Sequence, residues 1–124
     1  MNIVDTCGWL EYIADSVNAV NFEKAILNTT ELIIPSVVLY EVFKKILNDY
    51  NEDKALLITA HMKLGKVIDL DESLAIYAAK ISIEKKLPMA DSIIYATAER
   101  YGAVLYTQDD HFSKLNGVKY FKKK

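Results

Sequence analysis

The 124-residue sequence contains one cysteine, two prolines and four glycines. A single cysteine, Cys7, cannot form an intrachain disulfide, so we exclude a small disulfide-stapled fold and expect a reducing compartment. The low glycine and proline content leaves no room for a flexible linker, and 52% hydrophobic residues argue against intrinsic disorder. No run approaches the roughly 20 apolar residues that a membrane-spanning helix needs. We therefore expect a single globular domain over residues 1–124, with no membrane segment.

The charge of the chain is nearly balanced, with 15 basic and 17 acidic residues and a net charge of -2. Such a chain cannot hold nucleic acid by bulk positive charge. Lysines gather in the C-terminal segment 119–124, and solvation alone is the ordinary explanation for such a run. The N-terminus reaches Asp5 without a basic region, so we expect no signal peptide and a cytoplasmic protein.

Short apolar runs alternate with longer stretches of helical periodicity along the chain. The expected strands are 3–4, 32–34, 67–68, 103–106 and 117–121. The expected helices are 6–16, 21–28, 36–48, 51–64, 71–86 (or 73–86) and 90–101. We expect Ser36 to cap its helix and Gly65 and Gly102 to end theirs. Apolar strands separated by helices predict an α/β fold, in which a twisted parallel sheet of four to five strands has helices on both faces.

Four acidic residues fall where such a sheet places its chemistry. Ligands of open parallel sheets bind beyond the carboxyl ends of the strands. Asp5 follows the first strand directly, and Asp109 comes shortly after the fourth. Glu41 lies on the helix that follows the second strand. Asp91 lies in the first turn of the last helix, where the helix dipole favours an anion.

Three of these acids also have a purely structural explanation. Asp5 can cap the first helix, and Asp109 can shape a turn. Glu41 can pair on the surface with Lys45, one helical turn later. Asp91 differs, because it shares a helix face with apolar residues and the burial of an unpaired carboxylate is costly. It is either the N-terminal acid of its own helix or a group held toward a pocket.

Four carboxylates at one edge of a sheet would repel one another, and a hard divalent cation relieves that repulsion. Mg²⁺ prefers oxygen ligands and is commonly held by one or two carboxylates together with waters and substrate phosphates. Zinc fits less well, because the one cysteine and the two histidines, His61 and His111, show no ligand spacing. We therefore expect Mg²⁺ or Mn²⁺ at this edge.

Four blocks of the sequence resemble the PIN-domain ribonucleases, most closely the VapC toxin subunits of VapBC toxin–antitoxin pairs. The blocks are residues 3–7, 34–36 with Glu41, 87–98 and 102–112. They occur in order over nearly the whole chain. The resemblance implies a three-layer PIN fold and a metal-dependent endoribonuclease that cleaves phosphodiesters of single-stranded or structured RNA. It also implies a VapB-like antitoxin as partner, and a homodimer.

The resemblance also implies which residues form the site. The acidic quartet that would be catalytic and hold Mg²⁺ or Mn²⁺ consists of Asp5, Glu41, Asp91 and Asp109. Thr6 and Thr107 match the small hydroxyl positions beside those carboxylates. A slip of one residue in the match would exchange Asp109 for Asp110.

Two further residues receive no catalytic role. The family does not make His111 catalytic, so we predict that it is structural. Asp69 follows the third strand, and we predict that it is a turn or cap residue.

Three other functions remain open from the sequence. A PIN nuclease can act in RNA maturation or decay instead of as a toxin. A PIN scaffold can bind partners without cleaving RNA. A receiver-like phosphoacceptor domain has a similar length and sheet, with Asp69 as its acceptor, but it needs a second acid that the residues after Asp5 do not supply.

Overall fold

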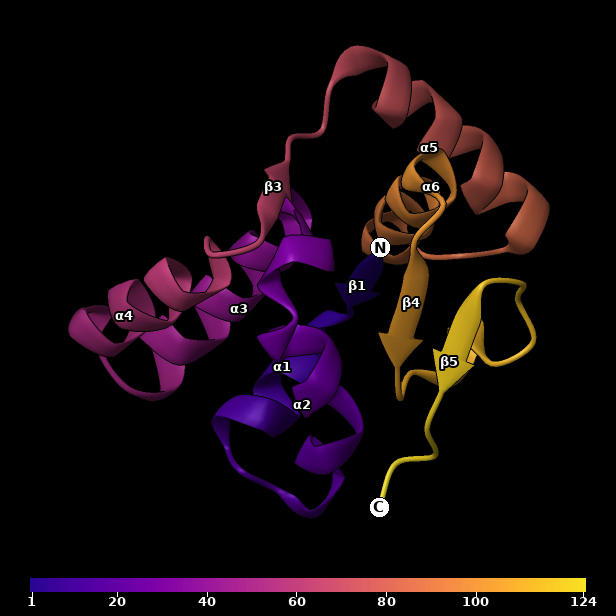
Figure 1. Ribbon diagram of the computed structural model, residues 1–124. Coiled ribbons are helices and arrows are strands. Elements are labelled where there is room, and N and C mark those ends of the chain that lie inside the picture. The colour runs from indigo at the N-terminus through magenta and orange to yellow at the C-terminus, as the bar shows by residue number, and fades with distance from the viewer.

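A parallel sheet of five strands forms the centre of the computed structural model, which describes residues 1–124 (Figure 1). The strands are β1 (Asn2–Val4), β2 (Leu32–Pro35), β3 (Lys66–Ile68), β4 (Val104–Thr107) and β5 (Val118–Tyr120). Their order in the sheet is β3-β2-β1-β4-β5, and every pairing is parallel. The predicted parallel α/β fold is confirmed.

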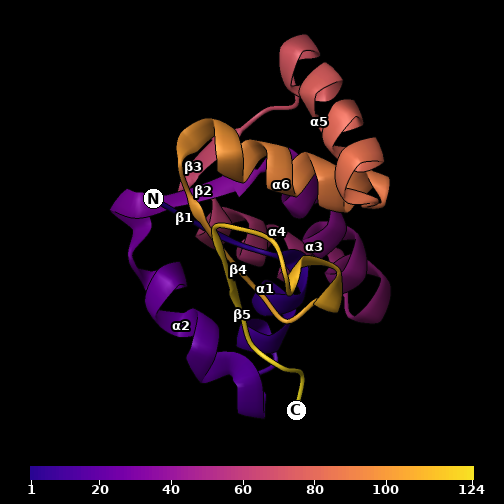
Figure 2. The ribbon, with the colours of Figure 1, turned by 90° about the vertical axis from the view of Figure 1, so that its right-hand side faces the viewer.

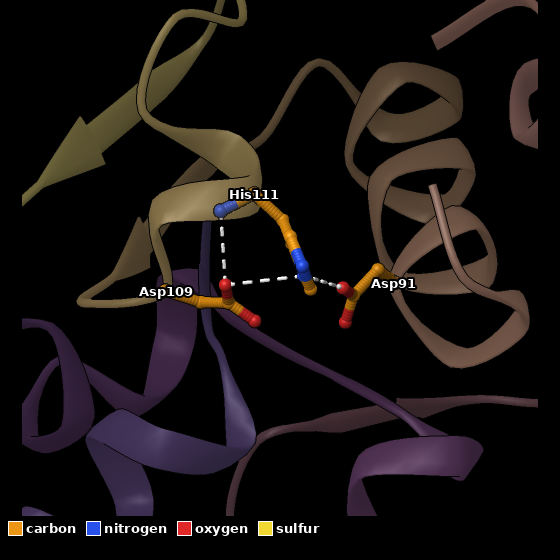
Figure 3. A group of neighbouring side chains, drawn as sticks. All are labelled: Asp91, Asp109 and His111. Carbon is orange, nitrogen blue, oxygen red and sulfur yellow. Dashed lines mark hydrogen bonds and ion pairs between the residues drawn. The ribbon is translucent and has the colours of Figure 1, made fainter. Parts of the chain in front are cut away.

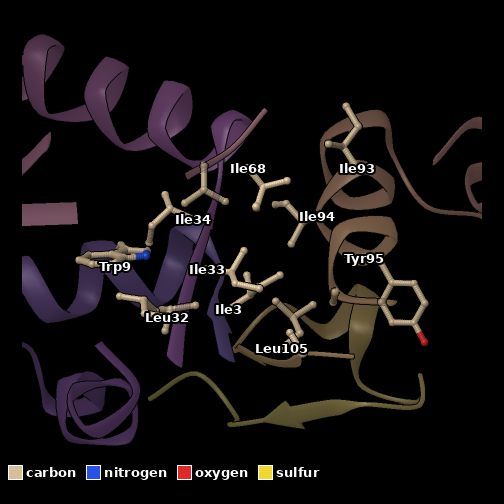
Figure 4. Close-up of a cluster of buried hydrophobic side chains, with 14 of the residues drawn as sticks. Ile3, Trp9, Leu32, Ile33, Ile34, Ile68, Ile93, Ile94, Tyr95 and Leu105 are labelled. Atoms are coloured by element: carbon tan, nitrogen blue, oxygen red, sulfur yellow. The ribbon is translucent and has the colours of Figure 1, made fainter. Parts of the chain in front are cut away.

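Helices cover both faces of this sheet. They are α1 (Thr6–Ile13), α2 (Val20–Leu27), α3 (Ser36–Asp49), α4 (Glu52–Met62), α5 (Glu72–Lys85) and α6 (Met89–Tyr101), with a 3-10 turn η3 (Asp110–Phe112) after β4. Trp9 of α1 and Ile94 of α6 lie on opposite sides of the strands (Figure 4). Helix α5 packs against α6 on the outside of the molecule (Figure 2). None of these helices has the length and apolar character needed to cross a membrane.

The central strands are apolar throughout because both of their faces are buried. Ile3 of β1 pairs with Ile33 of β2 and with Leu105 of β4, and all three side chains are 0% exposed. Successive side chains of a strand alternate between faces. Accordingly, Ile33 points toward Ile94 on α6, whereas Ile34 points toward α1 (Figure 4). This two-sided core fixes the carboxyl ends of β1 and β4 beside each other.

Two of the predicted helix boundaries are wrong. Ser36 is the first residue of α3 and not its cap. Pro35, the last residue of β2, occupies the N-cap position, and its side chain has no hydrogen-bond acceptor with which to cap the helix. Helix α4 ends at Met62 with Lys63 as its C-cap, so Gly65 does not end it. A Cβ at Gly65 would lie 2.9 Å from the carbonyl oxygen of Leu32, so this glycine permits the close approach of the chain to β2.

Candidate metal-binding active site

The carboxyl edge of the sheet gathers the four predicted acids from four elements. Asp5 follows β1 and caps α1, and its backbone N–H donates to the carbonyl of Tyr106 in β4 at 2.9 Å. Asp109 follows β4 and caps η3. Asp91 lies in the first turn of α6, and Glu41 lies on α3, which begins where β2 ends. Adjacent parallel strands end at the same edge, which is why residues so distant in the sequence approach one another here.

Asp5 is the most deeply buried of these acids, with 4% of its surface exposed. Its Oδ1 accepts a hydrogen bond from the backbone N–H of Thr6 at 2.8 Å, and its Oδ2 accepts one from the Thr107 hydroxyl at 2.7 Å. The same hydroxyl oxygen accepts the backbone N–H of Asp109 at 2.9 Å. Thr107 therefore joins the two strand-end acids and fixes the orientation of Asp5.

The Asp5 carboxyl is held in an environment that disfavours its charge. Burial, with a smaller contribution from the charges of Asp91 and Asp109, raises its pKa to about 6, although the hydrogen bonds from Thr107 and Thr6 act in the opposite direction. Burial also raises the pKa of Asp91, with a further contribution from the charges of Asp109 and Glu41. Asp91 therefore lies within electrostatic range of the other three acids.

Asp91, Asp109 and His111 form the tightest group in the site (Figure 3). One ligand atom from each of the three lies within 4.8 Å of the other two. His111 Nδ1 is 2.9 Å from Asp91 Oδ2 and 3.3 Å from Asp109 Oδ1. The backbone N–H of His111 also donates to Asp109 Oδ1 at 2.9 Å. Asp5 and Glu41 lie outside this group of three.

Glu41 is tied to α1 through a threonine. The Thr6 hydroxyl donates to Glu41 Oε1 at 2.6 Å. The alternative explanation of Glu41 as a surface partner of Lys45 is wrong, because Lys45 pairs with Asp49 at 3.1 Å. Thr6 thus orients Glu41 as Thr107 orients Asp5.

Three residues that the sequence left outside the acidic quartet lie at different distances from it: Asp110, Asp69 and His111. Asp110 opens η3 and is exposed, whereas Asp109 faces Asp91 across His111. Asp69 is exposed after β3, which is an edge strand. The sequence predicts a structural role for His111 and does not indicate that its ring lies between Asp91 and Asp109. Its separation of two residues from Asp109, across the start of a turn, is the one sequence signal for this position.

The pKa shifts predict how metal-free stability depends on pH. The pKa of Asp5 is about 6 in the fold against an ordinary value of 3.8, so between these values the folded state binds more protons than the unfolded chain. Stability therefore falls as pH rises from about 4 to about 6, by up to roughly 3 kcal/mol. Urea unfolding in EDTA across this interval measures it. Asp5→Asn should flatten the profile, and a rise in wild-type stability over the interval would contradict the account.

Fold and site together define an α/β protein with an acid-lined candidate cation site at the carboxyl edge of its sheet. The family model of the PIN domain matches residues 3–118. The chain therefore belongs to the PIN-domain family, and the predicted resemblance is confirmed. No protein of curated function matches the chain.

Several solved structures share this fold. A toxin–antitoxin complex from Klebsiella pneumoniae has a TM-score of 0.83 at 18% identity, covering 99% of this chain and 100% of its own. DNA-bound VapBC from Salmonella typhimurium has a TM-score of 0.74 at 21% identity, covering 98% of each chain. Mycobacterium tuberculosis VapC20, a toxin that cleaves the sarcin-ricin loop, has a TM-score of 0.75 at 16% identity. The match covers 94% of this chain and 95% of VapC20. At these identities the similarity establishes the fold.

Proposed function

We propose that the protein is a metal-dependent endoribonuclease and the toxin of a type II toxin–antitoxin pair. The observation that carries this proposal is the convergence of acids from β1, α3, α6 and β4 on one edge of a PIN-domain sheet. The proposed catalytic and metal-holding residues are Asp5, Glu41, Asp91 and Asp109. Solved structures that share this fold include a toxin–antitoxin complex and a toxin that cleaves the sarcin-ricin loop, which supports the same assignment.

The residues present fit a hard divalent cation such as Mg²⁺ or Mn²⁺. The site offers several carboxylate oxygens, which are the ligands that these ions prefer. Asp5 is buried with a raised pKa among other acids, and a cation relieves that unfavourable charge. When bound, such an ion would act as a Lewis acid that stabilises the charge developing on the phosphate, and it would lower the pKa of a water that it binds.

The chain's own side chains then have distinct tasks. Asp91 and Asp109 face the space around His111, and their side chains are 16% and 30% exposed. Thr107 and the Thr6 backbone fix the Asp5 carboxylate, and the Thr6 hydroxyl fixes Glu41. Such outer contacts hold the carboxylates in place before substrate arrives.

Two cavities flank the acids and carry lysines that can contact RNA phosphates. On the α3 side, Glu41 lines a cavity of about 900 Å³ that also contains Lys44 and Lys45. On the β5 side, Asp109 lines a cavity of about 460 Å³ with Lys122 and Lys123. Lysine contacts to phosphates contribute affinity without base specificity. We propose that the RNA strand crosses the acidic edge between these two basic flanks, which gives the C-terminal lysine run a role beyond solvation.

Loss of the C-terminal lysines should weaken RNA binding without changing the fold. We expect Lys122→Gln with Lys123→Gln to reduce the slope of log affinity against log salt by roughly 1.4, because two phosphate contacts to a single strand are lost. Fluorescence anisotropy with a short single-stranded RNA, in an Asp91→Asn background that does not cleave, measures this slope. The charge-matched control is Lys85→Gln with Lys86→Gln, at the end of α5. Equal effects of both pairs would contradict the proposed path.

A partner also belongs to the proposal. The cavity beside Glu41 is bordered by Tyr40 and Leu47, which are 62% and 43% exposed. Exposed apolar side chains are a typical contact surface for a protein partner. We propose that the partner is a VapB-like antitoxin that binds beside the acids and inhibits the toxin. A homodimer and a cytoplasmic location are parts of the same proposal.

Controlled expression in bacteria tests the proposed function. We expect induction of the wild-type protein to arrest growth and to produce new RNA 5′ ends at defined positions, and co-expression of the antitoxin to prevent both. The matched control is Asp5→Asn at equal abundance, which should do neither. Cleavage of RNA without growth arrest would favour the alternative of RNA maturation or decay, and binding without cleavage would favour a scaffold.

The receiver-like alternative is wrong. The chain is a PIN-domain protein, and Asp69 follows the edge strand β3 instead of a strand next to β1. A phosphoacceptor at Asp69 would therefore stand apart from the acids that follow β1 and β4.

A further inference from the structure

We propose that His111 is a nitrogen ligand of the metal site, so that the site takes a mixed oxygen and nitrogen donor set and prefers Mn²⁺ or a later transition ion to Mg²⁺. This inference rests on the proposed function, because it concerns the ion that the acids hold. It gives a role to the one residue of the tight group that the acidic quartet does not include.

The geometry of the group carries the inference. His111 Nδ1 lies 2.9 Å from Asp91 Oδ2 and 3.3 Å from Asp109 Oδ1. Neighbouring ligand atoms around one octahedral ion with bonds near 2.1 Å are separated by about 3 Å. The imidazole nitrogen therefore already lies at the separation of an adjacent ligand from one oxygen of Asp91 and one of Asp109. Figure 3 shows the His111 ring between the two carboxylates.

The position of His111 is also fixed by the backbone. Asp109 caps η3, and its Oδ1 accepts the backbone N–H of His111 at 2.9 Å. This contact holds the histidine beside Asp109 whatever the ring does. The His111 side chain is 52% exposed, so the ring can adjust toward an ion without displacing packed residues.

A nitrogen ligand changes which ions bind well. Imidazole suits the transition metals, whereas Mg²⁺ keeps to oxygen ligands and waters. Removal of His111 should therefore weaken binding of Mn²⁺ and Co²⁺ more than binding of Mg²⁺. If the ring instead acts as a counter-ion that occupies the place of the metal, its removal should strengthen binding of all these ions.

Metal titration of tag-free protein separates these roles. Free Mn²⁺ is followed by its electron paramagnetic resonance signal, and Mg²⁺ affinity is obtained by competition. We expect His111→Ala and His111→Gln to lower Mn²⁺ affinity at least about tenfold while Mg²⁺ affinity changes by less than about threefold. Electron spin echo modulation should show an imidazole ¹⁴N coupling to Mn²⁺ in the wild type and none in the variants.

His61→Ala is the matched control, because His61 lies on α4 and stacks on Tyr12. It should leave both the Mn²⁺ affinity and the ¹⁴N coupling unchanged. Tighter or unchanged Mn²⁺ binding in the His111 variants, or no ¹⁴N coupling in the wild type, would overturn the inference while leaving an all-oxygen nuclease site intact. Failure of the wild type to bind either ion would overturn the proposed function itself.

Discussion

Asp91→Asn should reduce metal-dependent RNA cleavage by roughly a thousandfold or more and leave the protein folded. The substitution removes a proposed charged oxygen ligand from the group of Asp91, Asp109 and His111 but keeps a side chain of the same shape. A metal ion is worth several kcal/mol of transition-state charge stabilisation, and each 1.36 kcal/mol is a factor of ten in rate. The pKa of Asp91 is raised in the fold, so loss of its charge should not lower metal-free stability at neutral pH.

The control for this variant is Asp110→Asn. Asp110 is the exposed neighbour of Asp109, so its substitution removes the same charge from the same turn without removing a proposed ligand. Cleavage of a fluorescent single-stranded RNA in Mg²⁺ and in Mn²⁺ measures both variants. We expect Asp5→Asn and Asp109→Asn to behave like Asp91→Asn. Wild-type rates in any of the three would remove that residue from the mechanism, and loss of activity in Asp110→Asn alone would shift the assignment by one residue.

Divalent metal should raise the melting temperature by on the order of 10 °C. A ligand at a hundred times its dissociation constant stabilises the folded state by about 2.7 kcal/mol. In a chain of this size each kcal/mol is worth roughly 3–5 °C. Scanning calorimetry in EDTA and in millimolar Mn²⁺ or Mg²⁺ measures the shift.

The same experiment on variants locates the origin of the shift. Asp5→Asn removes a buried carboxyl whose pKa is about 6, so we expect the metal-free protein to melt higher at pH 7.5 and to respond less to metal. Asp69→Asn, an exposed acid after β3, should respond like the wild type. A metal response that Asp5→Asn leaves unchanged would place the ion elsewhere.

The fold follows closely from the sequence because its signals are local and agree with one another. Apolar runs identified the strands, and Gly102 ends α6 in the left-handed conformation that the sequence predicts. The local pattern predicts a helix end at Gly65, but the role of this glycine depends on the carbonyl of Leu32, which lies on a neighbouring strand. Helix boundaries that depend on tertiary contacts cannot be predicted from the local sequence pattern.

The acids of the site are predictable for a related reason, and their contacts are not. Asp5 and Asp109 follow adjacent strands, so the parallel topology alone brings them to one edge. The hydroxyl of Thr107 between them and the imidazole of His111 beside Asp91 depend on side-chain directions that only the folded chain defines.

The most direct test of the central claim is anomalous diffraction from crystals grown with Mn²⁺. We expect a manganese peak between Asp91 and Asp109, about 2.2 Å from a carboxylate oxygen of each, with Asp5 bound to the ion directly or through one water. Diffraction data collected at X-ray energies above and below the manganese absorption edge identify the element. No manganese at this edge of the sheet at millimolar Mn²⁺, or an ion that contacts none of these acids, would contradict it.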